Sequence, residues 1–313
     1  MIDITSVGEI LIDLTQNGVT EQGIPQFAAN PGGAPANLAV AAARLGASTA
    51  FIGKVGTDSF GTLLRNTLIE NKVDVSGMVT DLTCRTTLAV VALDKTGERT
   101  FSFYRDPSAD VNLRSEEISD EQLKNTRFLH FGSVSLTTDP ARSATLYAAK
   151  KAKKYGAIIS YDPNYRASLW SDEVTAIERM LEPLPMVDVL KVSDEELPLL
   201  TGTEDPDNGS AILADKGIRL VLVTLGANGA YYRFDGHTGH IPGVKVKVGD
   251  TNGAGDTFFG ATLAQLAKVG SLDALTAEML EEILTVSNKA AAITTSRHGA
   301  IPAMPTAEEV FGA

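Results

Sequence analysis

The sequence predicts an α/β protein built on an open, doubly wound and mostly parallel sheet, with a small second β-sheet beside it. After residue 110, short β-branched runs alternate with amphipathic stretches of helix length, which is the pattern of βαβ units. Two earlier segments instead alternate around turn signals, as β-hairpins do. No repeat, low-complexity tract or long linker divides the 313 residues. We therefore expect one domain spanning residues 1–313.

The buried parallel strands are expected in apolar runs of four to five residues. They are residues 128–131, 157–161, 187–191 and 220–224. Between them, residues 140–155 carry apolar side chains at helical spacing, and Gly156 suits the end of that helix. In doubly wound sheets, ligands bind outside the carboxyl ends of the strands. The residues that follow these runs are therefore where chemistry should be sought.

The two hairpins are expected to form a lid from residues 10–31 and 86–109. Residues 10–20 contain Asn17-Gly18, a strong hairpin-turn signal, and residues 86–104 alternate around the turn at 95–98. The alternative that both hairpins are edge strands of the main sheet remains open.

Composition excludes several classes of partner. The formal charge of −12 and the pI near 4.8 oppose the broad basic surface that nucleic acids or anionic membranes attract. The N-terminus lacks a signal-peptide pattern, and no apolar stretch is long enough to span a bilayer, so we expect a cytoplasmic protein. Cys84 is the single cysteine, which rules out an internal disulfide, and we expect it to be buried as a small apolar side chain.

The segment from Asp250 to Gly260 is the strongest candidate for chemistry. Gly253-Ala254-Gly255 precedes a helix-like run at residues 257–266, so backbone N–H groups can converge on an anion at a helix N-terminus. Asp256 would stand at the edge of this phosphate cradle as a proton acceptor. An ordinary helix N-cap explains Asp256 equally well from the local sequence. Neither a Walker P-loop nor a complete Gly-x-Gly-x-x-Gly fingerprint is present.

Two long motifs resemble those of the ribokinase-like (PfkB) carbohydrate kinases, and the resemblance covers essentially the whole chain. Residues 31–37, Pro-Gly-Gly-Ala-Pro-Ala-Asn, resemble the N-terminal signature of that family, and residues 250–260 resemble its C-terminal signature. The segments 103–110, 161–166 and 191–196 are most similar to those of bacterial fructokinases. Ribokinases usually carry a lysine where this chain has Ala34.

The resemblance implies a ribokinase-like three-layer α/β/α fold with a β-sheet lid. It implies phosphorylation of D-fructose to fructose 6-phosphate, with ATP as donor and Mg²⁺ as cofactor. A kinase for another sugar or sugar acid, such as ribose or 2-keto-3-deoxygluconate, is the main alternative, and a catalytically silent sugar-binding regulator is a weaker one. Sugar and ATP are then the expected small-molecule partners, and the β-lid offers a surface for a homodimer.

The resemblance also implies roles for individual residues. The catalytic set is Asp256, Arg166, Gly253, Ala254 and Gly255. The sugar-binding set is Asp13, Gly32, Gly33, Asn37, Tyr104, Arg105, Asn164, Arg166 and Asp256. Taken alone, Asp13 could equally be a solvated hairpin residue and Asn37 a helix cap. A base with an ordinary carboxyl pKa of about 4 would suffice, because the proton can move late in a loose transition state.

The nucleotide side is implied by a third set. It comprises Lys191, Ser193, Glu196, Thr224, Gly226, Gly229, Gly253, Gly255 and Asn288. Glu196 matches the glutamate of the family's Asn-x-x-Glu motif and is expected to act on Mg²⁺ indirectly, although Ser193 stands where the asparagine is usual. A K⁺ site is left open, formed mainly by backbone carbonyls of Asp250, Asn252, Thr294, Arg297 and Gly299.

Overall fold

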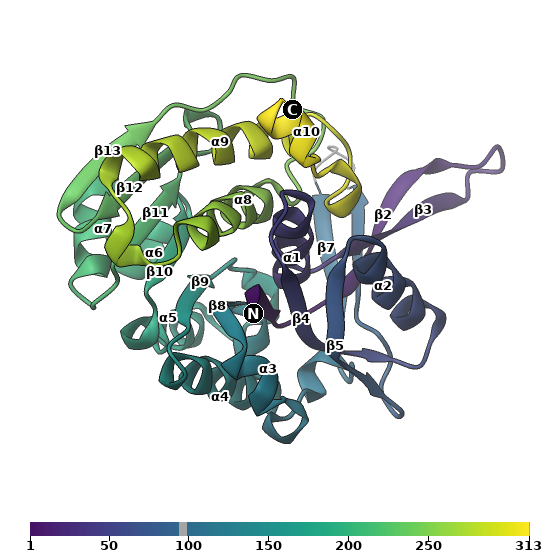
Figure 1. Ribbon diagram of the computed structural model, residues 1–313. Coiled ribbons are helices and arrows are strands. Elements are labelled where there is room, and N and C mark those ends of the chain that lie inside the picture. Colours follow the sequence, from purple (N-terminus) through teal and green to yellow (C-terminus); the bar gives the residue numbers. More distant parts are fainter. Residues whose placement is uncertain (94–98, 313) are drawn as a thin grey trace.

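The computed structural model describes residues 1–93 and 99–312 and contains a large sheet of nine strands (Figure 1). The strand order is β13-β12-β11-β10-β9-β8-β1-β4-β5. In that order the strands are His237–Ile241, Ala230–Phe234, Leu220–Thr224, Val189–Ser193, Ile158–Asp162, Thr126–Gly132, Ile2–Val7, Thr49–Gly56 and Val73–Asp81. Every neighbouring pair is parallel except β11·β12 and β12·β13. The mostly parallel sheet and its four predicted strands are confirmed.

Helices cover both faces of this sheet. They are α1 Ala34–Arg44, α2 Ser59–Glu70, α3 Asp120–Lys124, α4 Ala141–Lys154, α5 Glu173–Leu181, α6 Glu196–Thr201, α7 Pro206–Ala214, α8 Ala254–Val269, α9 Ala277–Thr295 and α10 Ala307–Phe311. Strand β11 shows why two layers are needed. Leu220 and Leu222 pack into the core under α8 and α9, whereas Val221 and Val223 pack into the opposite core with residues of α4 to α7. Successive strand side chains point to opposite faces, so an apolar run must be covered on both.

A separate sheet of four strands, ordered β3-β2-β6-β7, lies beside the large one (Figure 1). Its strands are β2 Leu11–Val19, β3 Pro25–Gly32, β6 Leu88–Leu93 and β7 Arg99–Tyr104. The pair β2·β6 is parallel, and the pairs β2·β3 and β6·β7 are antiparallel. We call this the small sheet. It confirms the predicted second sheet, and the alternative that both hairpins are edges of the main sheet is wrong. The predicted turn at 95–98 lies outside the described residues.

The predicted turn of the first hairpin is wrong. Strand β2 runs through Asn17-Gly18, where the pairing register with β3 shifts, and the chain reverses later, where Thr20 exchanges backbone hydrogen bonds with Gly23 and Ile24. Gly18 has φ +84° and Gly23 has φ +76°. The Asn-Gly pair correctly predicts a glycine in the left-handed region. In this strand, however, that conformation forms a β-bulge and not a hairpin turn.

The prediction for Cys84 is also wrong, because its side chain is half-buried. Its sulfur accepts a hydrogen bond from Asn112 Nδ2 at 3.3 Å, in a polar loop between the two sheets.

Helices α1 and α8 cross in close contact, which sets the distance between the two signature segments. A Cβ at Gly260 would lie 2.8 Å from Leu38 O and 2.9 Å from Ala41 Cβ. The absence of a side chain therefore allows the two backbones to approach, as small residues do wherever helices pack at short range. This approach places the first turn of α8 beside Asn37 of α1.

This close crossing makes a prediction about Gly260→Ala. Helix propensity alone would raise the free energy of unfolding by about 1 kcal/mol. We expect a fall of about 1–3 kcal/mol instead, because the methyl group meets backbone that cannot move aside. Urea unfolding followed by circular dichroism measures the sign. A more stable variant would show that the two helices have room between them.

Candidate active site

Asp256 lies in the first turn of α8, and both of its carboxylate oxygens are held by amides. Oδ2 accepts a hydrogen bond from Asn37 Nδ2 at 2.8 Å, and Oδ1 accepts one from Asn164 Nδ2 at 3.1 Å. The side chain is 8% exposed. The N-cap position of α8 is Gly253, with φ +75°, so the alternative that Asp256 is an ordinary N-cap is wrong. The first-turn N–H groups and the carboxylate share one helix end, as a phosphate cradle beside a base requires.

The two amides come from different parts of the fold. Asn37 is a buried residue inside α1 and does not cap it, because α1 starts at Ala34. Asn164 follows β9 and has φ +49°, a left-handed conformation that asparagine tolerates better than most residues. Its backbone N–H donates to Asp162 Oδ1 at 3.2 Å, which holds this strained turn. Backbone strain of this kind is typical of functional sites.

A cavity of about 90 Å³ opens beside Asp256. It is lined by Glu9, Leu11, Asp13, Gly33, Ala34, Asn37, Phe103, Val134, Asn164, Arg166, Asn252 and Asp256. Much of the predicted sugar-binding set is therefore brought together from segments far apart in the chain. Gly32 contributes by its lack of a side chain, since a Cβ there would stand 2.5 Å from Asp13 Oδ2.

Burial raises the pKa of the carboxyl groups in this cavity. The pKa of Asp13 is raised to about 6 by desolvation, which a hydrogen bond from Asn252 and the charge of Arg166 oppose. The pKa of Asp256 is also raised by burial, against the stabilising effect of Asn37, Lys191 and Arg166. An ordinary carboxyl pKa would suffice for the base, but burial in this structure raises the pKa of Asp256. A raised pKa makes Asp256 a stronger proton acceptor.

A buried ion pair lies beneath the first turn of α8. Lys191 Nζ contacts both oxygens of Asp162 at 3.0 and 3.2 Å, and both side chains are almost fully buried. A Cβ at Gly255 would lie 3.2 Å from Lys191 Nζ, so the glycine brings the ammonium group against the helix end. Burial raises the pKa of Asp162, against the opposing charge of Lys191.

Glu196 is engaged by backbone donors on both oxygens. Oε1 accepts from Tyr165 N–H at 2.7 Å and Oε2 from Ser193 N–H at 2.8 Å, while Ser193 Oγ accepts from Glu196 N–H at 3.1 Å. These bonds tie the loop after β9 to the loop after β10. Each oxygen already accepts a backbone hydrogen bond, which is consistent with the expected indirect role of Glu196 toward Mg²⁺.

Four of the predicted nucleotide residues lie near the ends of β11 and β13, namely Thr224, Gly226, Gly229 and Asn288. The turn Gly226–Asn228 packs so closely on the segment after β13 that a Cβ at Gly229, φ +95°, would stand 2.0 Å from Ile241 O. Asn288 Nδ2 donates to Ile241 O and Pro242 O, both at 3.2 Å, and so fixes the same segment. Thr224 Oγ1 donates to Val192 O at 3.4 Å.

Tyr104 and Arg105 lie away from the positions expected for sugar contacts. Tyr104 is 65% exposed and is not part of the cavity lining, which holds the neighbouring Phe103 instead. Successive side chains of β7 point to opposite faces of the small sheet, so Phe103 and Tyr104 cannot both face the cavity. Arg105 is buried in an ion pair with Asp110 at 2.8 Å and also donates to Val134 O at 3.0 Å. Because Val134 lines the cavity and Arg105 does not, Arg105 supports the cavity wall without forming part of it.

The two segments of the expected cation site do meet. Gly249 and Asp250 donate their N–H groups to Thr295 O, and Asp250 Oδ2 accepts from Gly299 N–H at 3.2 Å. Thr294 Oγ1 donates to Thr257 Oγ1 at 3.0 Å, and the Arg297 side chain pairs with Glu309. Any contribution of Thr294 and Arg297 to a cation site would therefore come from backbone carbonyls.

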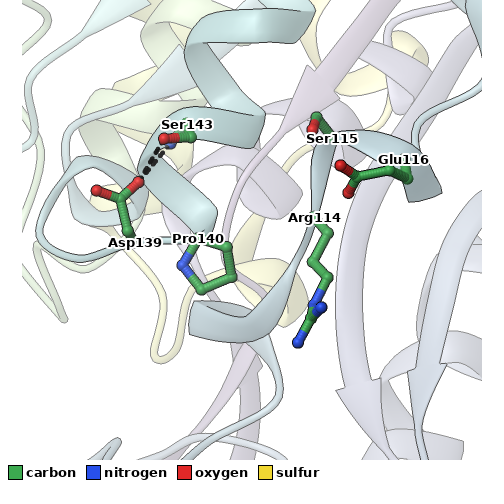
Figure 2. A pocket seen from close by; sticks show the side chains of 6 residues that line it. All are labelled: Arg114, Ser115, Glu116, Asp139, Pro140 and Ser143. Atoms are coloured by element: carbon green, nitrogen blue, oxygen red, sulfur yellow. Dashed lines mark hydrogen bonds between the residues drawn. The ribbon is translucent and has the colours of Figure 1, made fainter.

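A second cavity, of about 500 Å³, lies elsewhere and shares no residue with the first (Figure 2). It is lined by Arg114, Ser115, Glu116, Asp139, Pro140 and Ser143. The N-terminal end of α4 borders it, but Asp139 Oδ1 already accepts hydrogen bonds from Ser143 N–H and Oγ. A backbone donor at this helix N-terminus is therefore already paired within the chain. The volume of the cavity does not by itself make it a candidate site.

Several residues of the site have no role in the predictions from sequence, among them Glu9, Phe103 and Asp162. Glu9 and Phe103 line the cavity, and Asp162 forms the ion pair with Lys191. Glu9 follows β1, so the rule that ligands bind at the carboxyl ends of strands would have found it, had β1 been recognised as a strand. Phe103 and Asp162 lie within the segments 103–110 and 161–166, but the resemblance implied no role for either residue.

Comparisons with known proteins identify the family of this chain. A family model described as pfkB family carbohydrate kinase matches residues 1–307. The probable chloroplastic fructokinase-6 of Arabidopsis thaliana is 46% identical over 310 residues, covering 98% of this chain and 80% of that protein. The probable fructokinase-4 of the same plant is 44% identical over 311 residues, covering 98% and 95%.

Solved structures share the fold. Fructokinase from Xylella fastidiosa with bound ATP has a TM-score of 0.92 at 34% identity, covering 100% of this chain and 98% of that one. A double mutant of fructokinase from Vibrio cholerae O395, bound to fructose, ADP and potassium ion, has a TM-score of 0.89 at 35% identity, covering 99% and 97%. The expected ribokinase-like fold is thus confirmed, and the chain belongs to the pfkB family of carbohydrate kinases.

Proposed function

We propose that this protein transfers the γ-phosphoryl group of ATP to the 6-hydroxyl of D-fructose, giving fructose 6-phosphate and ADP. The observation that carries this proposal is the Asp256 carboxylate, fixed by Asn37 and Asn164 at a helix N-terminus and open to a polar cavity. The fructokinases among its relatives, at 43–46% identity over nearly the full chain, support the same substrate.

In the proposed reaction, Asp13 and Asn37 bind sugar hydroxyls, since a carboxylate and an amide suit hydroxyls presented in pairs. Asp256 accepts the proton of the 6-hydroxyl as its oxygen bonds to phosphorus and the bond to the leaving ADP oxygen breaks. N–H groups of Gly253, Gly255 and Asp256 stabilise charge on the transferred group, and Arg166 offsets part of it. Both products leave, and the proton on Asp256 returns to water.

The small sheet would act as a lid in this reaction. Leu11 and Phe103 line the cavity from that sheet, and Val134 lines it from the body of the protein. Closing apolar side chains over the sugar excludes water, which competes as a phosphoryl acceptor.

Mg²⁺ bound to ATP would neutralise charge on the β- and γ-phosphates. No group of three or more His, Cys, Asp or Glu side chains that could hold a metal ion occurs within residues 1–93 and 99–312. This fits an ion carried mainly by the nucleotide and water, as is usual for Mg²⁺ at phosphates. Glu196 would then act through the loops that it holds. We also propose a K⁺ site lined by backbone carbonyls, because residues 249–250 contact residues 295–299.

Oligomeric state and location also stay predictions. Val19, Ile24 and Phe27 of the first hairpin are exposed apolar side chains, which supports the proposed homodimer through the lid. In the described part of the chain, none of the helices is long and apolar enough to cross a membrane.

For the proposed reaction, the first prediction concerns the base. Asp256→Asn should lower kcat by at least about 1,000-fold, because the amide cannot accept the proton, while the fructose dissociation constant changes by less than about threefold. ADP release measured with fructose gives kcat, and calorimetry gives binding. Asp215→Asn, at an exposed position, is the control. Near-normal turnover of Asp256→Asn would remove Asp256 from this role.

The second prediction concerns pH. Asp13 and Asp256 must be ionised to act, and burial raises the pKa of both, that of Asp13 to about 6. We therefore expect kcat/KM for fructose to fall as pH drops below about 6, well above the range of an ordinary carboxyl. Initial rates from pH 5 to 8 provide the measurement. A profile that stays flat down to pH 5 would contradict it.

The third prediction separates fructose from a sugar acid. Carboxyl groups line the cavity, and Arg105 is committed to Asp110. Hence kcat/KM for fructose should exceed that for 2-keto-3-deoxygluconate by at least about 30-fold, with ribose and mannose as neutral comparisons. Equal or greater activity on the sugar acid would support the alternative kinase. Absence of ADP release with every sugar would instead favour a silent regulator.

A further inference from the structure

Glu9 is a buried carboxyl group in the sugar cavity that the proposed reaction does not yet use. It lies in the bend between β1 and β2, it is one of the residues that line the cavity, and it is 2% exposed. The bend is closely packed, because a Cβ at Gly33 would lie 2.6 Å from Glu9 O. The side chain is therefore held in place against the turn that carries Gly33.

One oxygen of Glu9 has a partner and the other has none. Oε1 accepts from Ala34 N–H at 3.2 Å, but Oε2 is buried without a hydrogen bond to another described residue; the backbone N–H of Glu9 itself lies near the carboxyl group and favours its ionised form. By contrast, Asp256 and Glu196 have both oxygens engaged. A buried oxygen without a partner is destabilising, so its retention beside a cavity points to a partner that arrives with the ligand.

Glu9 and Asp13 face different surroundings within the cavity. The charged groups that act on Glu9 are Arg105 and Asp110, at the base of the small sheet. Those that act on Asp13 include Arg166 and Asp256, near the phosphoryl side. Burial also raises the pKa of Glu9 to about 7, so near neutral pH its carboxyl group can donate as well as accept a hydrogen bond. These surroundings suit a hydroxyl other than the reacting one.

We propose that Glu9 is a specificity-determining residue of the sugar site, whose Oε2 hydrogen-bonds one non-reacting hydroxyl of the acceptor and so orients the 6-hydroxyl toward Asp256. This inference rests on the proposed sugar kinase activity. The ligand class is a neutral polyhydroxylated sugar, and the bond forms only when that sugar is bound.

The test combines enzyme variants with substrate variants. Glu9→Gln keeps an oxygen for Ala34 N–H but replaces Oε2 by an amide nitrogen, and Glu9→Ala removes both groups. With D-fructose we expect Glu9→Gln to raise KM about tenfold while kcat stays within about threefold, the change expected for one binding hydrogen bond. Glu117→Gln is the control outside the cavity, where Glu117 accepts from Arg114 N–H and pairs with Lys54.

Monodeoxy analogues of fructose that keep the 6-hydroxyl then identify the partner. For one analogue, lacking the hydroxyl that Glu9 binds, wild type and Glu9→Gln should have similar KM, because the interaction is already absent. An equal loss for fructose and every analogue would show that Glu9 only supports the turn or holds a water, and would overturn the inference. An unchanged KM for fructose would overturn it as well. Wild type without activity on fructose would instead overturn the proposed function.

Discussion

The site depends on the two hydrogen bonds that asparagine amides donate to the Asp256 carboxylate. A buried carboxylate is costly, because desolvation disfavours its charge. Asn37 and Asn164 donate to separate oxygens and hold both in fixed directions. The charges of Lys191 and Arg166 further favour the ionised form. The result is a proton acceptor that is fixed in direction, largely dry and more basic than a free aspartate.

That interaction requires three elements to converge. Asn37 comes from α1, Asn164 from the loop after β9, and Asp256 from the first turn of α8. Close contact at Gly260 brings α1 and α8 together, while the bonds of Glu196 fix the loop that follows Asn164. Much of the polar structure near the sheet edge therefore supports the position of a single carboxylate. The buried pair of Asp162 and Lys191 belongs to this support, and it places a cation behind the helix end.

Sequence reasoning reached the fold class and the main chemistry for physical reasons. Buried parallel strands read as continuous apolar runs, and Gly253-Ala254-Gly255 before a helix reads as an anion site. The predictions were wrong where one local backbone pattern is compatible with more than one structure. Asn17-Gly18 has the left-handed glycine of a hairpin turn but forms a bulge, and Phe103 takes the place in the cavity that Tyr104 was expected to approach. Strand registers and turn positions depend on pairing with distant residues, which a local pattern does not contain.

By itself, the sequence determined the doubly wound sheet, the second β-sheet and the aspartate that follows a glycine turn, since these depend on periodicity and local backbone preference. Only the tertiary structure decided what each polar side chain faces. It removed the N-cap alternative for Asp256, paired Arg105 with Asp110, engaged both oxygens of Glu196 and left Oε2 of Glu9 buried in the cavity without a partner among the described residues. Burial and hydrogen bonding are properties of neighbours in space, and in this chain those neighbours come from segments as distant as Asn37 and Asp256.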